Sequence, residues 1–223
     1  MVKDKLIVAL DFHTKEDALA LVDKLGDSVV FYKVGMELFY RVDSSIIEEL
    51  KKRNKKIFLD LKLHDIPNTV AQGLCSLLYQ GVDIMNVHAS GGYTMMKTAA
   101  DTVRAEAKKM GIEAPKIIAV TILTSIKDQV IRLAKLTKEA GLDGVVASPQ
   151  EAKFIREACG EDFLIITPGV RPAGASIDDQ SRIATPARAL ADGATHLVVG
   201  RPIRAAQNPV EAAENILKEM ENA

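Results

Sequence analysis

Eight short apolar segments recur along the chain, and the stretches between them have the spacing of amphipathic helices. The segments begin at Leu6, Val29, Lys56, Asp83, Lys116, Gly144, Phe163 and His196. In two intervening stretches, 18–25 and 210–220, apolar residues stand three or four positions apart, as in a helix that buries one face. Thr14, and Asn208 followed by Pro209, are typical helix-start signals. Strand and helix are therefore predicted to alternate eight times.

This alternation predicts a parallel sheet covered by helices on both faces, because continuously apolar strands leave no face for water. Eight units of about 28 residues match the α/β class and its (β/α)8 TIM barrel. A doubly wound open sheet is the alternative, but it would carry a glycine-rich turn after the first strand, and residues 6–17 contain no glycine. We expect a single TIM-barrel domain over residues 1–223.

Composition excludes several classes of protein. Apolar residues make up 48% of the chain and charged residues 26%, so it is neither disordered nor fibrous. A formal net charge of -1 provides no overall field for nucleic acid or an anionic membrane. No run of about 18 apolar residues is present, and Cys75 and Cys159 lie outside any C-x-x-C motif. We expect a soluble cytoplasmic protein with buried free thiols and no nucleic-acid or membrane partner.

Charged and polar residues follow the predicted strands, where the active sites of barrels lie. The third strand, residues 56–64, is the most informative. Its odd-numbered residues from Ile57 to Leu63 are apolar, whereas Asp60 and Lys62 share the other face. Two ions in a barrel mouth are costly unless they are paired, so a chain that keeps them there is expected to use them. A structural ion pair that plugs the barrel is the alternative.

Lys33 ends the second predicted strand, and Asp65 follows Lys62 by three residues. Together with Asp60, two lysines and two aspartates could therefore converge in alternating order. Carboxylates nearby favour the protonated form of each lysine. A protonated lysine can donate a proton but is a poor nucleophile, which weighs against an aldolase-type Schiff base.

The segments after the last two strands are typical of a phosphate site. ITPGVRP contains Arg171, and VVGRPI contains Gly200 and Arg201. In barrels, the loops after strands seven and eight commonly bind phosphate, because glycine admits backbone N–H groups and arginine binds two oxygens. Surface arginines without a ligand are the alternative. The loop 172–182 could close over a ligand, with Gln180 as its reaching side chain.

No cofactor or metal is expected. The four histidines show neither i to i+4 pairing nor an HExxH motif, and a lysine at position 33 would repel a cation. The chain also lacks a G-x-S-x-G motif and a P-loop, so hydrolase and kinase functions lose support.

The segment FLDLKLHDIPNTV, residues 58–70, resembles the signature D-x-K-x-x-D-I-x-x-T of the orotidine 5'-monophosphate decarboxylase family, in its bacterial form. The likeness extends in order to LDF in the first strand, KVG in the second, TPGVRP and VGRPI, and so covers essentially the whole chain. It implies cofactor-independent decarboxylation of orotidine 5'-monophosphate to uridine 5'-monophosphate, the last step of de novo pyrimidine nucleotide synthesis, by a homodimer.

The resemblance also implies roles for individual residues. The implied catalytic residues are Lys33, Asp60, Lys62 and Asp65, with Lys62 as the proton donor. The implied substrate contacts are Asp11 and Lys33 at the ribose, Asn68 and Thr69 in the ribose and phosphate region, Thr124 at the pyrimidine, and Arg171, Gln180, Gly200 and Arg201 at the phosphate. Asp65 and Thr69 would reach the site of the other subunit.

The fifth unit departs from the family pattern, because ILTSIKDQVIRLAK passes almost directly into a helix where family members carry a longer loop. Two other functions remain open. A 3-keto-gulonate 6-phosphate decarboxylase shares D-x-K-x-x-D but uses Mg²⁺ held partly by an acidic residue at the position of Lys33. A non-catalytic barrel that binds a phosphate ligand is compatible with the short loop.

Overall fold

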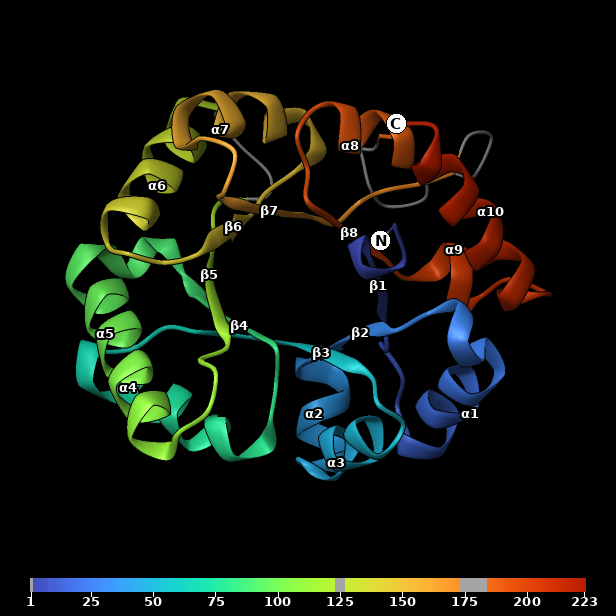
Figure 1. Cartoon of the computed structure of the whole chain (residues 1–223), viewed down its shortest axis with the longest axis horizontal. Coiled ribbons are helices and arrows are strands. Elements are labelled where there is room, and N and C mark those ends of the chain that lie inside the picture. The colour runs from blue at the N-terminus through green and yellow to red at the C-terminus, as the bar shows by residue number, and fades with distance from the viewer. Residues whose placement is uncertain (1, 123–126, 173–183) are drawn as a thin grey trace.

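The computed structural model describes residues 2–122, 127–172 and 184–223 (Figure 1). The strands are β1 (Leu6–Ala9), β2 (Phe31–Gly35), β3 (Lys56–Leu63), β4 (Ile84–His88), β5 (Lys116–Val120), β6 (Gly144–Val146), β7 (Leu164–Thr167) and β8 (His196–Val199). The α-helices are α1 (Lys15–Leu25), α2 (Met36–Val42), α3 (Ser45–Lys52), α4 (Pro67–Leu77), α5 (Gly92–Met110), α6 (Lys127–Glu139), α7 (Ala152–Cys159), α8 (Pro186–Ala191), α9 (Arg201–Arg204) and α10 (Pro209–Glu221). Short 3₁₀ turns are η1 (Val2–Lys5), η2 (Gly26–Ser28), η3 (Leu78–Gln80), η4 (Ala89–Gly91) and η5 (Pro149–Glu151).

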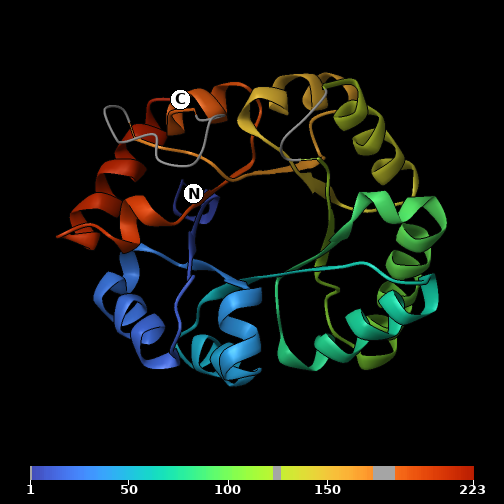
Figure 2. The same cartoon turned by 180° about the vertical axis from the view of Figure 1, so that it is seen from behind.

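The strands pair in parallel and in chain order, and β1 also pairs with β8, so that the sheet closes into a barrel. Helices surround this barrel on all sides, as both views show (Figures 1 and 2). Each predicted apolar segment overlaps one observed strand. The predicted TIM barrel is confirmed, and the open sheet is excluded.

Apolar side chains of the strands alternate between two cores. One core fills the barrel interior with Ile7, Ala9, Phe31, Phe58, Ile84, Ile118, Val120, Val146, Ile166 and Val198. The intervening residues of the same strands, such as Leu6 and Val8 in β1, pack outward against the helices. Because both faces are buried, the strands read as continuous apolar runs. The filled interior leaves the strand ends as the place for polar chemistry.

The predicted helix starts are also present. Thr14 caps α1 by accepting the backbone N–H of Asp17, and Asn208 caps α10 in the same way from Glu211. Both cysteines are buried free thiols, as expected. Within the described ranges, no helix combines the length and the apolar character needed to cross a membrane.

Candidate active site

Four charged side chains meet where β1, β2 and β3 end. The Nζ atom of Lys33 lies 2.9 Å from Oδ1 of Asp11 and 3.6 Å from Oδ2 of Asp60. The Nζ atom of Lys62 lies 2.8 Å from Oδ1 of Asp60. The side chains of Lys33 and Asp60 are only 12% and 11% exposed. Within one chain the predicted alternating array therefore forms, but its second carboxylate is that of Asp11 rather than Asp65.

Local backbone features make room for this array and hold its edge. A Cβ atom at Gly35 would lie 2.8 Å from Nζ of Lys33, so a larger residue in the KVG segment would displace the ammonium group from its present place. Arg204, in α9, donates a hydrogen bond to the backbone carbonyl of Asp11, and its guanidinium lies 5.3 Å from the ring centre of Phe12. Arg204 thereby fixes the loop that carries Asp11, a role with no signal in the sequence pattern.

Asp60 is the most buried carboxylate of the array. Burial alone would raise its pKa, because water no longer solvates the charge. Attraction by Lys33 and Lys62, with hydrogen bonds from Lys62 and Asn86, outweighs that effect and holds the pKa of Asp60 below its ordinary value. Asp60 is consequently ionised at neutral pH, and it serves as the common partner of both lysines.

Two features of this region escaped prediction from the sequence. The regular alternation of β3 does not continue past Asp60, because the register with β4 shifts between Leu59 and Leu63. Within that shift, Lys62 has a φ of 55°, in the left-handed region. Asn86 of β4 is fully buried and bonds to Asp60. In the sequence, the feature that could have pointed to Asn86 is an amide side chain within the apolar segment DIMNV.

The ends of β3 and β4 add two histidines beside the array, His64 after β3 and His88 as the last residue of β4. The rings of His64 and His88 lie 5.6 Å apart. Burial, together with repulsion by His64 and Lys62, lowers the pKa of His88. His88 is therefore neutral at pH 7 and adds no cation next to Lys62.

The predicted phosphate residues follow the neighbouring strands β7 and β8. Arg171 is only 6% exposed, and its guanidinium donates to the carbonyl of Val170. Gly200 precedes α9, in which Arg201 is partly buried. A Cβ atom on Gly200 would lie 3.9 Å from Oδ2 of Asp11, so this segment borders the charged array. The geometry leaves phosphate binding by these residues as a prediction.

The remaining predicted residues stand outside the array of a single chain. Asp65, Asn68 and Thr69 are exposed, and Oδ1 of Asp65 accepts the backbone N–H of Ile66 at 2.6 Å. Thr124 and Gln180 lie outside the described residues, as do most of the short fifth loop and positions 173–182 of the predicted closing loop.

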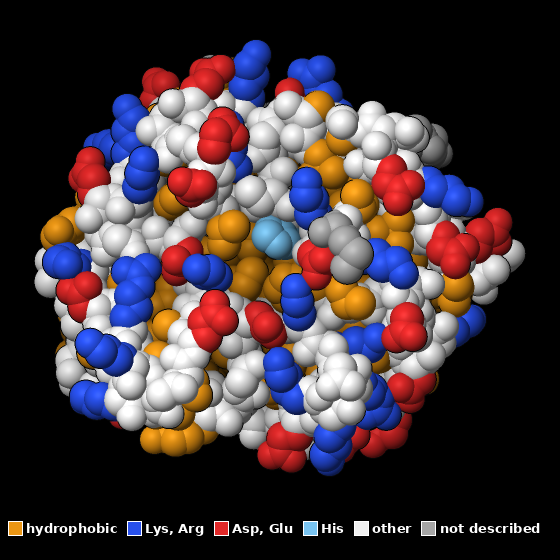
Figure 3. Space-filling model, in the orientation of Figure 1, with side chains coloured by type: hydrophobic (Ala, Val, Ile, Leu, Met, Phe, Trp, Pro, Cys, Tyr) orange, Lys and Arg blue, Asp and Glu red, His pale blue; other side chains and the backbone are white. Residues whose placement is uncertain are grey.

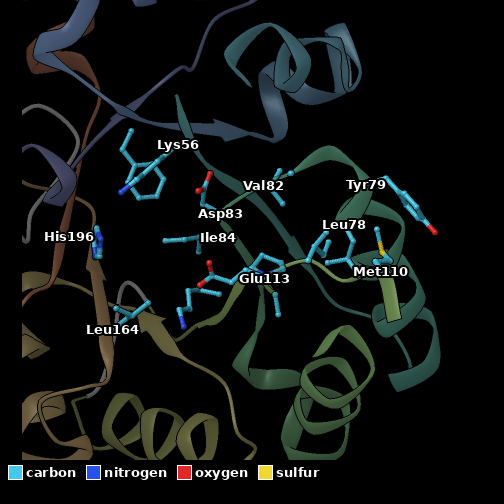
Figure 4. Close-up of a pocket in the computed structure, with 16 residues that line it drawn as sticks. Lys56, Leu78, Tyr79, Val82, Asp83, Ile84, Met110, Glu113, Leu164 and His196 are labelled. Carbon is cyan, nitrogen blue, oxygen red and sulfur yellow. The ribbon is translucent and has the colours of Figure 1, made fainter. Parts of the chain in front are cut away.

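A cavity of about 650 Å³ opens near the amino-terminal ends of the strands and is a second possible site (Figure 4). Its lysines at positions 56 and 116 pair with Asp4 and Asp143, and burial lowers the pKa of His196 to about 4, so that this ring is neutral. Figure 3 shows this amino-terminal end of the barrel, with charged side chains of both signs around an apolar hollow. The charges at the carboxyl ends of the strands therefore form the better candidate site.

The fold and the position of the charged side chains are those of a TIM-barrel enzyme. Residues 4–216 match the model of the Orotidine 5'-phosphate decarboxylase / HUMPS family, and the chain belongs to this family. It is 50% identical to an orotidine 5'-phosphate decarboxylase of Moorella thermoacetica, covering 98% of this chain and 93% of that protein. The corresponding enzyme of Haemophilus influenzae is 47% identical, covering 95% and 96%.

A solved structure agrees. The crystal structure of orotidine 5'-phosphate decarboxylase from Lactobacillus acidophilus superposes with a TM-score of 0.85 at 44% identity, covering 98% of this chain and 99% of that one. The family resemblance inferred from the third-strand signature is thereby confirmed over nearly the whole length.

The lowered pKa of Asp60 predicts how the array affects stability. The stabilisation that the ionised carboxylate provides is complete above its unfolded-state pKa, near 3.8, and is lost as pH falls through the lower folded-state pKa. The difference in unfolding free energy between wild type and Asp60→Asn should thus be largest above about pH 4 and should shrink on acidification. Urea unfolding at fixed protein concentration measures it. If the difference in unfolding free energy grew below pH 4, the pKa of Asp60 would not be lowered in the folded protein.

Proposed function

We propose that the protein converts orotidine 5'-monophosphate to uridine 5'-monophosphate and CO₂ without a cofactor, as the last step of de novo pyrimidine nucleotide synthesis. The observation that carries this proposal is the Asp11–Lys33–Asp60–Lys62 array at the carboxyl ends of the strands. Membership of the family supports it. The two buried thiols suit a reducing compartment, and we place the enzyme in the cytoplasm.

The reaction needs a fixed positive charge where a carbanion forms. When the C6–carboxylate bond breaks, CO₂ leaves and its bonding electrons remain on C6 as a vinyl carbanion with no adjacent electron sink. A preorganised ammonium group stabilises such a charge without reorganising. In this proposal Lys62 supplies the ammonium and transfers one proton to C6, which gives uridine 5'-monophosphate and a neutral amine that water reprotonates.

Asp60 has two roles in the proposed reaction. Its Oδ1 atom holds Nζ of Lys62 at 2.8 Å, so the proton donor is positioned before substrate binds. Its negative charge also lies close to the departing carboxylate and raises the energy of the bound substrate relative to the transition state. Lys33 and Asp11 bind the ribose hydroxyls next to this pair.

The phosphate is bound away from the reacting carbon, by Arg171, Gly200 and Arg201, with Gln180 from the loop. Binding energy from this remote group can be used in the transition state and in closing the loop over the site. Asn68 and Thr69 line the ribose and phosphate region, and Thr124 contacts the pyrimidine.

We propose that the enzyme is a homodimer in which Asp65 and Thr69 complete the partner's site. Both residues are exposed in the single chain. Large apolar side chains are exposed on the segments that follow β2, β3 and β4, namely Met36, Tyr40, Ile66 and Tyr93. Ile66 is 66% exposed and directly follows Asp65. An apolar surface beside Asp65 supports burial against a second copy of the chain.

A magnesium-dependent 3-keto-gulonate 6-phosphate decarboxylase is the runner-up of the same fold. The ammonium of Lys33 lies within 3.6 Å of both carboxylates that a cation would need, which disfavours it. A phosphate-binding barrel without activity is the alternative from another class. Release of CO₂ from orotidine 5'-monophosphate in the presence of EDTA separates the three functions. Release that EDTA abolishes, or no release from the folded dimer, would refute the proposal.

In the same assay, Lys62→Ala should reduce decarboxylation by at least about a thousandfold, because the variant lacks both the cation at C6 and the proton donor. Binding of uridine 5'-monophosphate, measured by calorimetry, should persist, since the phosphate and ribose contacts lie elsewhere. Turnover close to that of wild type would exclude Lys62 as the donor.

Arg201→Ala should mainly raise KM for orotidine 5'-monophosphate, by about tenfold or more, because it removes a charge-assisted contact to the phosphate. If phosphate binding also closes the loop, kcat falls as well. Steady-state kinetics measure both constants. Arg188→Ala, which removes an exposed arginine paired with Asp192, is the matched control and should leave KM unchanged. An unchanged KM for Arg201→Ala would place the phosphate elsewhere.

Inactive Lys62→Ala and Asp65→Ala chains should complement each other when they are mixed. In a mixed dimer one site receives the intact Lys62 and the partner's intact Asp65, and the other site lacks both. Random exchange of equal amounts makes about half of the dimers mixed, so about a quarter of all sites should regain activity. Activity is followed after exchange has been verified by mass spectrometry. No recovery would show that Asp65 acts within its own chain.

A further inference from the structure

The backbone around Lys62 is unusual for a central strand. Leu59 of β3 pairs with Met85 of β4, but the next pair joins Leu63 to Val87. Between these two pairs β3 advances by four residues while β4 advances by two, which is a bulge in β3. Lys62 lies inside this bulge with a φ of 55°. A residue other than glycine rarely adopts such a backbone conformation, and the conformation persists only where surrounding contacts hold it. The contacts that hold Lys62 therefore decide where its ammonium lies.

Asn86 provides one of these contacts directly. Its side chain is fully buried in β4, and its Oδ1 atom accepts the backbone N–H of Lys62 at 2.8 Å. Its Nδ2 atom donates to Oδ1 of Asp60 at 2.6 Å. The orientation of the amide follows from chemistry, since a backbone N–H can only donate and an ionised carboxylate can only accept.

The same oxygen of Asp60 also receives Nζ of Lys62, at 2.8 Å. The amide of Asn86 thus bonds both to the backbone N–H of Lys62 and to the carboxylate that pairs with the ammonium group of Lys62. An apolar residue at position 86 would break both contacts at once. It would leave the backbone N–H of Lys62 without this acceptor and Asp60 without one of its donors.

We propose that Asn86 is a positioning residue for the decarboxylation, holding the bulge of β3 and the carboxylate of Asp60 so that the Lys62 ammonium is aligned before substrate binds. The inference rests on the proposed function, because it takes Lys62 as the proton donor. Asn86 acts through Lys62 and Asp60, so its loss should reduce the rate of the chemical step and spare substrate binding.

The pH profile adds an independent readout. Asp60 faces Lys33 from β2, Lys62 from its own strand and His88 at the end of β4, while Asp11 lies beyond Lys33. The hydrogen bond from Asn86 is one of the contacts that lower the pKa of Asp60. Without it that pKa rises, so the acid limb of kcat, where Asp60 becomes protonated, should move to higher pH.

Asn86→Leu tests the loss of both contacts. We expect kcat to fall about 10- to 100-fold, the acid limb to shift upward, and the affinity for uridine 5'-monophosphate to stay within about twofold of wild type. Thr137→Val is the matched control, because Thr137 is equally buried but its hydroxyl bonds to Leu133 and Met96 in the helices rather than to the array. It should lower the unfolding temperature and leave kcat unchanged.

Asn86→Asp is close to isosteric and keeps an acceptor for Lys62, but at neutral pH it places a second carboxylate against Asp60. Its kcat should fall at pH 7 and recover toward lower pH, where a shared proton restores the donor, opposite to the trend for Asn86→Leu. A kcat within twofold of wild type for both variants, or loss of nucleotide binding by both, would overturn the positioning role. Absence of CO₂ release from the wild type would instead refute the proposed function.

Discussion

The carboxylate of Asp60 is the interaction on which the arrangement of this site depends. It is nearly buried between two lysines, and an isolated charge in that position would be strongly destabilising. Lys33 and Lys62 offset this cost, while Asp60 in turn keeps two ammonium groups close together despite their mutual repulsion. Removing any one member would leave an uncompensated charge. The ion pair of Lys33 with Asp60 consequently joins β2 to β3 at the end of the barrel, where the backbone hydrogen bonds between the strands stop.

The barrel makes such a site possible by separating two physical environments. Inside, below the array, apolar side chains from the strands pack against one another. At the carboxyl ends of the strands, side chains from neighbouring strands converge without needing long loops. The segment proposed to bind phosphate also adjoins the array, since Gly200 lies beside Asp11. A substrate with a charged end and a reactive ring can therefore span both regions on a rigid frame.

The sequence predicted the fold well and the site in part. The spacing of apolar residues predicted eight alternating strands and helices, and the absence of a glycine-rich turn after the first strand favoured the closed barrel over an open sheet. The convergence of Lys33, Asp60 and Lys62 was predictable, because the residues at the carboxyl ends of parallel strands meet at one end of a barrel. The bulge at Lys62 and the bond from Asn86 were not, since register shifts depend on contacts between strands that are distant in sequence. A buried polar residue in an apolar strand is the signal that points to such contacts.

Charge balance also bears on why a second chain would be needed. Within one chain the array holds two lysines and two aspartates, and is formally neutral. In the proposed dimer, the partner contributes one more carboxylate through Asp65, so the site becomes net negative before substrate brings its own carboxylate. When neutral CO₂ leaves, the negative charge of the substrate carboxylate moves from the neighbourhood of the aspartates onto C6, beside Lys62. The excess charge thus disfavours the bound substrate more than the transition state, provided that the array is too rigid to relax. Rigidity is what the buried amide of Asn86 would supply.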